Sequence, residues 1–305
     1  MSWSSVRVPA SSANIGPGFD ALGLALAVYL ECRFRPAPRL AIRAEGRDAD
    51  LIPAGEDNLI WQTALAVAEK MRMPLPPIEL EIRNDIPLGK GLGSSAAALT
   101  AGVVIADVLL GLKWKPLRIL DEAARLEGHP DNVAACTLGS IVASAIDSGG
   151  VARAVRLELP ARFGVGVVVP DFVLPTSEAR AVLPDCYSRQ DAIFNVQRAA
   201  LLIAALAAGA VWAFPAALED RFHQPYRAPL VAGLDEILKL RAPGLLGCAL
   251  SGAGPSILVF FEKGYDQVCD LVRQVFRLHG HASEVLLTRI AETGFDLRED
   301  ESQGE

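Results

Sequence analysis

Apolar and polar residues alternate with two different periods along this chain, and these periods predict both strands and helices. Short apolar runs and strict alternation favour strands, which we expect at residues 6–8, 22–26, 40–44, 78–82, 141–146, 165–169 and 283–287, with two more around a glycine turn within 247–261. Apolar residues spaced three and four apart favour helices, which we expect at residues 58–71, 96–106, 115–126, 231–240 and 265–279. This mixture predicts an α+β fold.

The chain of 305 residues is long for one hydrophobic core and therefore predicts two domains. Asp147-Ser148-Gly149-Gly150 is a turn sequence that follows a predicted strand. We place the boundary there, which gives an N-terminal domain of residues 1–150 and a C-terminal domain of residues 151–305.

One segment has the length of a membrane span, because residues 199–218 carry no charge. Most of these residues are alanines, which contribute little transfer free energy, and Gly209 and Pro215 interrupt the run. We expect a buried helix of a soluble domain and no membrane partner.

Composition narrows the classes of function. The hydrophobic share of 51% and the charged share of 21% are those of a globular protein. The net charge of −7, without any run of Lys or Arg, argues against a nucleic-acid partner. The Met1–Arg7 segment does not resemble a signal peptide.

The five cysteines show no metal-binding spacing, so we expect buried thiols in a reducing, cytoplasmic environment; they are Cys32, Cys136, Cys186, Cys248 and Cys269.

The strongest candidate for chemistry is the glycine loop Pro87-Leu88-Gly89-Lys90-Gly91-Leu92-Gly93-Ser94-Ser95-Ala96-Ala97. Its glycines permit positive φ, Ser94 is a good N-cap, and the alanine-rich run that follows favours a helix. A glycine loop that opens into a helix presents free N–H groups to an anion such as phosphate. Lys90 adds positive charge, and the hydroxyl of Ser94 or Ser95 could bind Mg²⁺.

Two other interpretations of this loop remain open. Gly91-x-Gly93-x-x-Ala96 matches the weak dinucleotide-binding pattern, but that pattern needs an uninterrupted strand before it and an acid at the tip of a second strand. Here Pro87 interrupts the approach, and Asp107 lies in a helical pattern. A structural turn with a helix cap is the other alternative. We favour a phosphate site.

Two further segments concentrate polar side chains. Glu127, His129, Asp131 and Asn132 follow a predicted helix that Gly128 and Pro130 end. An acid at a helix C-terminus opposes the helix dipole, and this cost favours a functional role for Glu127, such as one oxygen ligand of Mg²⁺. Residues 10–20 form a loop with Asn14 and Asp20, which fits either a binding edge or a tight turn.

The glycine loop closely resembles the second motif of the GHMP kinases, a family named for galactokinase, homoserine kinase, mevalonate kinase and phosphomevalonate kinase. The run from Ser12 to Asp20 resembles the first motif, and Leu250-Ser251-Gly252-Ala253-Gly254-Pro255-Ser256 resembles the third, with Ala253 where serine is usual. The run from Glu127 to Val133 resembles the homoserine kinase branch. The motifs lie in family order along essentially the whole chain.

This resemblance implies a two-domain GHMP kinase fold with the active site in the cleft between the domains. It implies ATP and Mg²⁺ as cofactors, and ATP-dependent phosphorylation of L-homoserine to O-phospho-L-homoserine in threonine biosynthesis. A homodimer is compatible with it. A mevalonate-type kinase and a non-catalytic ligand-binding relative remain alternatives, although intact Ser95 and Glu127 argue against the second.

The resemblance also implies roles for individual residues. The substrate side would comprise Asn14, Asp20, His129, Asn132, Arg180 and Arg227, with an arginine clamp on the carboxylate. The phosphate side would comprise the glycine loop and Thr176, which could also cap a helix that carries Arg180. Asn58 would lie near the adenine, although an N-cap explains it equally well.

The metal ligands would be Ser95 and Glu127, with Ser94 and Glu122 as rivals. The catalytic residues would be Asp20, His129, Asp131 and Arg180. Asp20 and Asp131 are the two candidates for a base, and a mechanism without a base is also open.

Overall fold

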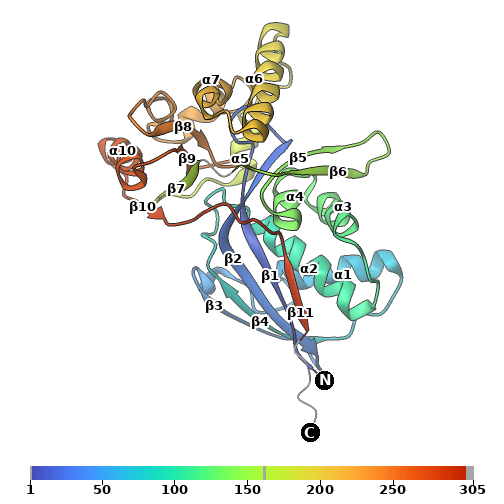
Figure 1. Ribbon diagram of the computed structural model, residues 1–305. Coiled ribbons are helices and arrows are strands. Elements are labelled where there is room, and N and C mark those ends of the chain that lie inside the picture. Colours follow the sequence, from blue (N-terminus) through green and yellow to red (C-terminus); the bar gives the residue numbers. More distant parts are fainter. Residues whose placement is uncertain (1, 161–162, 300–305) are drawn as a thin grey trace.

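The computed structural model describes residues 2–160 and 163–299 and contains two β-sheets (Figure 1). The first sheet has seven strands in the order β11-β1-β2-β4-β3, and β5 pairs with β2 and carries β6 beside it. Its strands are β1 (Ser4–Ala13), β2 (Leu22–Pro36), β3 (Ala41–Gly46), β4 (Ile78–Asn84), β5 (Ile141–Ile146), β6 (Ala152–Leu157) and β11 (Asp296–Glu299). The β3–β4 pair is parallel and the other pairs are antiparallel.

The second sheet has four antiparallel strands in the order β10-β7-β9-β8. They are β7 (Gly164–Pro170), β8 (Leu245–Leu250), β9 (Ile257–Phe261) and β10 (Ser283–Leu286). The helix α10 (Tyr265–Leu278) packs on this sheet through an apolar face that includes Val268, Val272 and Phe276.

Four helices cover one face of the first sheet (Figure 1). They are α1 (Leu59–Met71), α2 (Ser94–Leu110), α3 (Pro116–Glu127) and α4 (Asp131–Leu138). The helix α2 is central and contacts β1, β2 and the other three helices, and nearly all its residues from Ala96 to Asp107 are buried. Small side chains in α2 permit this close packing, so the start of α2 is held rigidly.

The remaining helices belong to the C-terminal half. They are α5 (Thr176–Ala181), α6 (Arg189–Ala208), α7 (Phe214–Ala217), α8 (Gln224–Arg227) and α9 (Leu234–Ile237), with short 3-10 turns at Ala49–Leu51, Val211–Ala213 and Ala228–Leu230. The α+β class and the presence of helices and strands in both halves confirm the fold prediction.

Several predicted elements differ from the observed ones. The helix expected at residues 231–240 is only the single turn of α9, because Gly233 adopts a φ of 73° and starts it late. The uncharged run at residues 199–218 is not one buried helix. It comprises the second half of α6, which ends at Gly209, and then two short turns.

The helix α6 is apolar and long enough to cross a membrane by length and composition alone, but 22% of its most apolar stretch is buried inside the protein. Its buried Asn195 donates a hydrogen bond to the carbonyl of Pro17 and accepts one from the amide of Arg221. These hydrogen bonds attach α6 to the loop between β1 and β2 and to the segment before α8.

The domain boundary at residue 150 stays a prediction, and the first sheet includes β6 and β11 from beyond it. Two further expectations need correction. The loop expected from residue 10 begins at Asn14, because β1 continues to Ala13. Among the cysteines, Cys186 is exposed.

Candidate active site

A polar cavity of about 100 Å³ lies where the first sheet, the start of α2 and the second half of the chain meet. It is smaller than the roughly 300 Å³ that suits a drug-sized ligand, so it fits a small polar group. The residues that line it are Ala13, Asn14, Asp20, Gly89, Gly91, Leu92, Gly93, Ser94, Ser95, Glu127, His129, Asp131, Asn132, Thr176, Arg180, Arg227, Gly252 and Ala253. All three sequence motifs therefore reach one cavity.

The glycine loop forms one wall, and its geometry explains the glycines. Gly91 and Gly93 have φ values of 74° and 67°, which side chains other than glycine rarely adopt. A Cβ on Gly91 would lie 2.3 Å from the carbonyl oxygen of Ser251, and a Cβ on Gly93 would lie 1.9 Å from Oγ of Ser11. The loop is therefore clamped between β1 and the glycine turn that follows β8.

The loop leads directly into α2, whose first amides have no acceptor within the helix. Gly93 occupies the N-cap position and makes no side-chain cap, so Ser94 is the first helical residue and not the N-cap that we predicted. Ser94 and Ser95 both line the cavity. The positive end of the α2 dipole consequently points at the cavity, which suits an anion.

Lys90 does not line this cavity. Its ammonium donates to the carbonyls of Pro170 and Phe172 at 2.9 and 2.8 Å. Burial lowers the pKa of Lys90, and the charges of Asp171 and Asp48 oppose this only in part. Lys90 therefore ties the glycine loop to the segment after β7.

Glu127 is the last residue of α3 and lies beside the start of α2. Oγ of Ser95 donates a hydrogen bond of 3.2 Å to its carboxylate. Burial raises the pKa of Glu127, and the charge of His129 and the Ser95 hydrogen bond offset this only in part. A half-buried carboxylate beside a hydroxyl offers two of the hard oxygen ligands that a divalent cation prefers.

The rival carboxylate, Glu122, is placed elsewhere. Its side chain is fully buried and forms ion pairs with Lys70, Arg118 and Arg125. Burial alone would raise its pKa, but the hydrogen bonds and charges of Lys70 and Arg125 lower it overall. Because the charge of Glu122 is compensated by three basic side chains, Glu127 is the better candidate ligand for a metal ion.

Asp20 and Arg180 meet across the cavity although they lie far apart in sequence. Two guanidinium nitrogens of Arg180 donate to the two carboxylate oxygens of Asp20 at 2.8 and 3.2 Å, in a bidentate pair. Burial lowers the pKa of Arg180, but the Asp20 hydrogen bond and charge outweigh it and the pKa is raised. Both groups are half-buried and remain accessible to a ligand.

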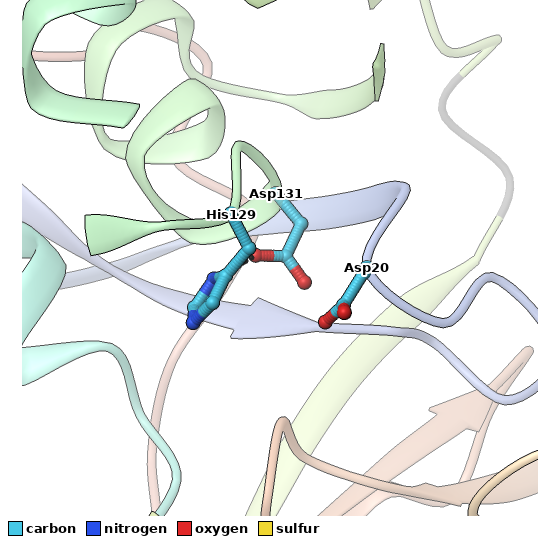
Figure 2. A group of neighbouring side chains, drawn as sticks. All are labelled: Asp20, His129 and Asp131. Carbon is cyan, nitrogen blue, oxygen red and sulfur yellow. Dashed lines mark hydrogen bonds and ion pairs between the residues drawn. The ribbon is translucent and has the colours of Figure 1, made fainter. Parts of the chain in front are cut away.

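His129, Asp131 and Asp20 form a compact cluster in which their ligand atoms lie within 4.8 Å of one another (Figure 2). Nδ1 of His129 lies 3.1 Å from the Asp131 carboxylate, which also accepts from the Asn132 amide at 2.7 Å. Burial lowers the pKa of His129, but the Asp131 hydrogen bond and charge and the charge of Glu127 raise it overall. Because Asp20 is paired with Arg180 and Asp131 with His129, this cluster is less open to a metal than Ser95 and Glu127.

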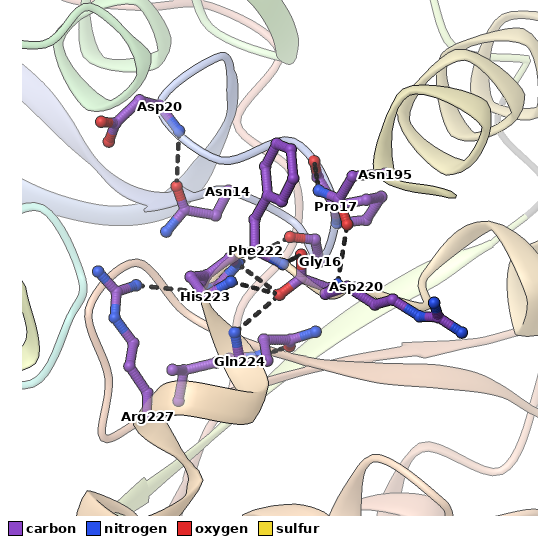
Figure 3. Close-up of polar contacts among 12 residues, drawn as sticks. Asn14, Gly16, Pro17, Asp20, Asn195, Asp220, Phe222, His223, Gln224 and Arg227 are labelled. Carbon is purple, nitrogen blue, oxygen red and sulfur yellow. Dashed lines mark hydrogen bonds and ion pairs between the residues drawn. The ribbon is translucent and has the colours of Figure 1, made fainter. Parts of the chain in front are cut away.

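Asn14 and Arg227 close the cavity on the side of the glycine turn (Figure 3). The Asn14 side chain donates to the carbonyl of Gly252 at 2.9 Å and accepts from the Asp20 amide at 3.0 Å. Arg227 is fully buried and donates to the carbonyls of Ala179 and Gly252. Burial and the charge of Arg180 lower the pKa of Arg227 to about 10, so it stays cationic near neutral pH.

The other predicted residues lie outside or at the edge of the cavity. Asn58 is a buried N-cap that accepts from the amides of Ile60 and Trp61. Thr176 lines the cavity but is the first residue of α5 and makes no side-chain cap, because Pro175 holds the N-cap position. Pro87, Leu88, Ala96 and Ala97 are absent from the lining and serve as flanks of the loop.

Sequence reasoning missed several polar residues that support the site. Ser11 donates to the Asn132 side chain at 2.8 Å, and Ser251 contacts both Ser12 and the carbonyl of Gly91. His223, which lies outside the sequence motifs, has Nδ1 3.0 Å from Nη1 of Arg227. Ser11 and Ser12 are adjacent serines among apolar residues of β1, and Ser251 lies in the third motif, so the sequence offered a signal for these three. No local sequence pattern indicated a role for His223.

Two family models match the chain: the GHMP kinases N terminal domain at residues 58–140 and the GHMP kinases C terminal domain at residues 202–277. Homoserine kinase of Solibacter usitatus (strain Ellin6076) is 76% identical over 97% of this chain and 97% of its own length. Homoserine kinase of Deinococcus radiodurans is 48% identical over 85% of this chain and 84% of its own length.

Solved structures agree with these relatives. The crystal structure of homoserine kinase from Cytophaga hutchinsonii ATCC 33406 superposes with a TM-score of 0.84 at 28% identity and covers 98% of both chains. These similarities span the whole chain and favour the homoserine kinase branch over the mevalonate-type alternative. The chain belongs to the homoserine kinases of the GHMP kinase family.

Proposed function

We propose that this protein transfers the γ-phosphoryl group of ATP to the side-chain hydroxyl of L-homoserine, giving O-phospho-L-homoserine, and that the cavity described above is the place of transfer. Phosphoryl transfer depends mainly on positioning and on neutralisation of negative charge. The cavity offers an anion-binding wall at the start of α2 and an amino-acid-binding wall at Asp20, Arg180 and Arg227. The adjacency of these two walls carries the proposal.

The triphosphate would bind at the glycine loop. The first amides of α2 point at the cavity and provide hydrogen-bond donors without any rearrangement. Lys90 contributes indirectly, since its bonds to the carbonyls of Pro170 and Phe172 hold the loop in place.

Ser95 and Glu127 would hold Mg²⁺, which when bound supplies positive charge to the phosphate oxygens. The donor set fits, because a hydroxyl and a carboxylate are hard oxygen ligands and Mg²⁺ in nucleotide sites takes only one or two from the protein. The raised pKa of Glu127, caused first by burial, is that of a carboxylate without its counter-ion.

The amino acid would bind at the Asp20–Arg180 pair. A zwitterionic substrate presents one cation and one anion, so its ammonium can pair with Asp20 while Arg180 and Arg227 pair with its carboxylate. The ion pair between Asp20 and Arg180 would thereby be replaced by ion pairs of these two residues with the amino acid. Asn14 would hold the Asp20 loop, through its bond to the Asp20 amide.

His129 and Asp131 would act at the hydroxyl end of the substrate. Asp131 holds a proton on Nδ1 of His129, and the raised pKa of His129 favours the cationic ring. A cationic His129 would stabilise the negative charge on the transferring group, with Asn132 as a further donor. Asp20 and Asp131 both remain candidate bases, since Asp20 is paired with Arg180 and Asp131 with His129.

A coupled ADP-release assay tests this function, with L-homoserine, L-threonine, mevalonate and galactose as acceptors. We expect turnover with L-homoserine and at most a trace with the other three. Turnover that favours mevalonate, or no ADP release with any acceptor, would overturn the proposal.

A further inference from the structure

His223 is a buried titratable residue that the proposed chemistry does not use. It precedes α8 and has no exposed surface. Its ring stacks on Phe19, with centroids 5.4 Å apart and an interplanar angle of 25°. Phe19 in turn faces the guanidinium groups of Arg180 and Arg227 at 5.7 and 5.5 Å. His223 therefore lies directly behind the wall that would bind the amino acid.

The two ring nitrogens of His223 have different partners, and these define its protonation state (Figure 3). Nε2 lies 2.8 Å from the carbonyl oxygen of Gly16, which can only accept, so Nε2 carries the hydrogen. Nδ1 lies 3.0 Å from Nη1 of Arg227, which can only donate, so Nδ1 is the acceptor. The ring is consequently neutral and in a single tautomer.

The electrostatic surroundings agree with a neutral ring. Burial lowers the pKa of His223, the Arg227 charge lowers it further, and the charge of Asp220 opposes both without reversing them. The Asp220 carboxylate lies 3.5 Å from Nε2, beyond ordinary hydrogen-bond distance, and accepts instead from the amides of residues 222–224.

Arg227 is held on three sides. Nε donates to the carbonyl of Ala179, and Nη1 donates to the carbonyl of Gly252 and to His223. Among the residues that the structure describes, none accepts a hydrogen bond from Nη2, and Arg227 lines the cavity. These three bonds together fix the guanidinium plane so that the Nη2 edge is available to a ligand, and the bond to His223 is the one of the three made by a side chain.

We propose that His223 is a positioning residue for the substrate: it accepts from Arg227 so that the free Nη2 edge faces the carboxylate of the bound amino acid. This rests on the proposed role of Arg227. A neutral imidazole suits this place because it orients the cation without cancelling its charge. A carboxylate there would compete with the substrate for Arg227.

Three substitutions separate the two bonds of His223. His223→Asn retains an acceptor near the position of Nδ1, His223→Gln retains a donor near the position of Nε2, and His223→Leu removes both. Loss of a hydrogen bond to a charged group corresponds to about a 10- to 100-fold effect. We therefore expect KM for L-homoserine to rise about 10- to 100-fold in His223→Leu and His223→Gln, with KM for ATP unchanged, and to stay within a few fold of wild type in His223→Asn.

A double variant distinguishes this inference from the role of Arg227 itself. Arg227→Leu should raise KM for L-homoserine, and adding His223→Leu to it should raise KM no further, because the two residues act through one bond. If Arg227→Leu leaves KM for L-homoserine unchanged, the role of Arg227 fails. If Arg227→Leu raises KM but the two substitutions add in full, the inference on His223 fails.

Two further outcomes of these experiments would also test the role of His223. Equal increases in both KM values, together with a lower unfolding temperature, would indicate a structural role for His223 and overturn the inference. Should His223→Leu not fold, the comparison of the other two variants suffices: equal KM values for L-homoserine in His223→Asn and His223→Gln would contradict it.

Discussion

Glu122 and Glu127 show how one helix can hold two carboxylates for different purposes. Glu122 is enclosed by three basic side chains, whereas Glu127 lines the cavity and, among the residues that the structure describes, accepts a hydrogen bond from the Ser95 hydroxyl alone. Both are on α3, and the sequence favoured Glu127 only through its place at the end of the helix. Their surroundings distinguish them, because a cation site needs a carboxylate whose charge is not yet compensated.

Glu127→Gln should therefore weaken the response to Mg²⁺ while leaving the fold intact. We expect the apparent Mg²⁺ affinity to fall by at least about tenfold, the lower end of the loss for partners of metal sites, with a matching fall in kcat at limiting Mg²⁺. Titration of ADP release against Mg²⁺ measures this.

Glu122→Gln is the matched control for that experiment. It removes charge-assisted hydrogen bonds, so we expect a loss of about 1.5–3 kcal/mol in the free energy of unfolding and an unchanged Mg²⁺ titration. The assignment of Glu127 would be wrong if the two variants exchanged these effects.

His129 should make the stability of the protein depend on pH. Its pKa is raised in the folded state, since the Asp131 hydrogen bond and charge outweigh the effect of burial. The folded state therefore binds this proton more tightly than the unfolded chain, whose histidine pKa is about 6.5. The stabilisation is complete below that value and disappears as pH rises through the folded pKa.

The measurement is the unfolding temperature of His129→Gln and wild type between pH 5 and pH 9. We expect the variant to lose more stability at the acidic end than at the alkaline end. A difference that is constant across this range, or larger at alkaline pH, would contradict the raised pKa.

At the scale of elements, the start of α2 is the feature on which the site depends. Gly93 and Gly111 flank this helix with φ values of 67° and 64°. A Cβ at Gly93 would overlap Ser11, whereas a Cβ at Gly111 would meet no atom within 4 Å. The two glycines therefore adopt the same backbone conformation and differ in what surrounds them.

This difference makes Gly93→Ala and Gly111→Ala a matched pair. Each should cost about 1–2 kcal/mol of stability, because alanine is strained at positive φ. Only Gly93→Ala should also displace Ser11 and the loop, and so raise KM for ATP by at least about tenfold. Thermal unfolding and initial-rate kinetics test both; an unchanged KM for ATP in Gly93→Ala would show that the loop does not bind the nucleotide.

Elements with clear end signals were predictable from the sequence. The helix expected at residues 115–126 is α3 at Pro116–Glu127, and the strand at residues 141–146 is β5 with the same bounds. The predictions failed where tertiary pairing decides the structure. β11 forms in a charged tail because β1 has a free edge there, and β2 continues well past residue 26 because β1 and β4 pair along its length.

Many of the residues that line the cavity were named from the sequence, but their arrangement was not. The motifs identified the side chains that line the cavity, yet the Asp20–Arg180 and His223–Arg227 contacts depend on how the two halves of the chain meet. No local pattern records such contacts. For the same reason the bonds of Lys90 to the segment after β7 could not be foreseen.

At the scale of the whole molecule, the two sheets are joined at the active site. Hydrogen bonds link the end of β1 to the glycine turn after β8, including Gly252 N to Ala13 O and the Asn14 side chain to Gly252 O. The glycine loop lies between these segments, and the Ser256 amide bonds to the Lys90 carbonyl. Residues that we propose to bind the substrate therefore also hold the two halves of the chain together.

Ser251 is the central side chain of this junction. Its Oγ lies 2.7 Å from the Gly91 carbonyl and 2.8 Å from Oγ of Ser12. The carbonyl can only accept, so Ser251 donates its single hydrogen to Gly91 and accepts from Ser12. The hydroxyl of Ser251 thereby connects the glycine turn, β1 and the glycine loop.

Ser251→Ala should therefore both lower the stability of the protein and loosen the glycine loop. Ser256→Ala, in the same turn, is the control variant. The first variant leaves the buried Gly91 carbonyl and Ser12 hydroxyl without this partner, which costs about 1–3 kcal/mol, and KM for ATP should rise. Oγ of Ser256 is buried without a partner among the residues described, so its removal should be neutral or slightly stabilising. Unfolding temperatures and KM values for both variants check this. Equal effects of the two substitutions would mean that the junction relies on packing and not on the hydroxyl of Ser251.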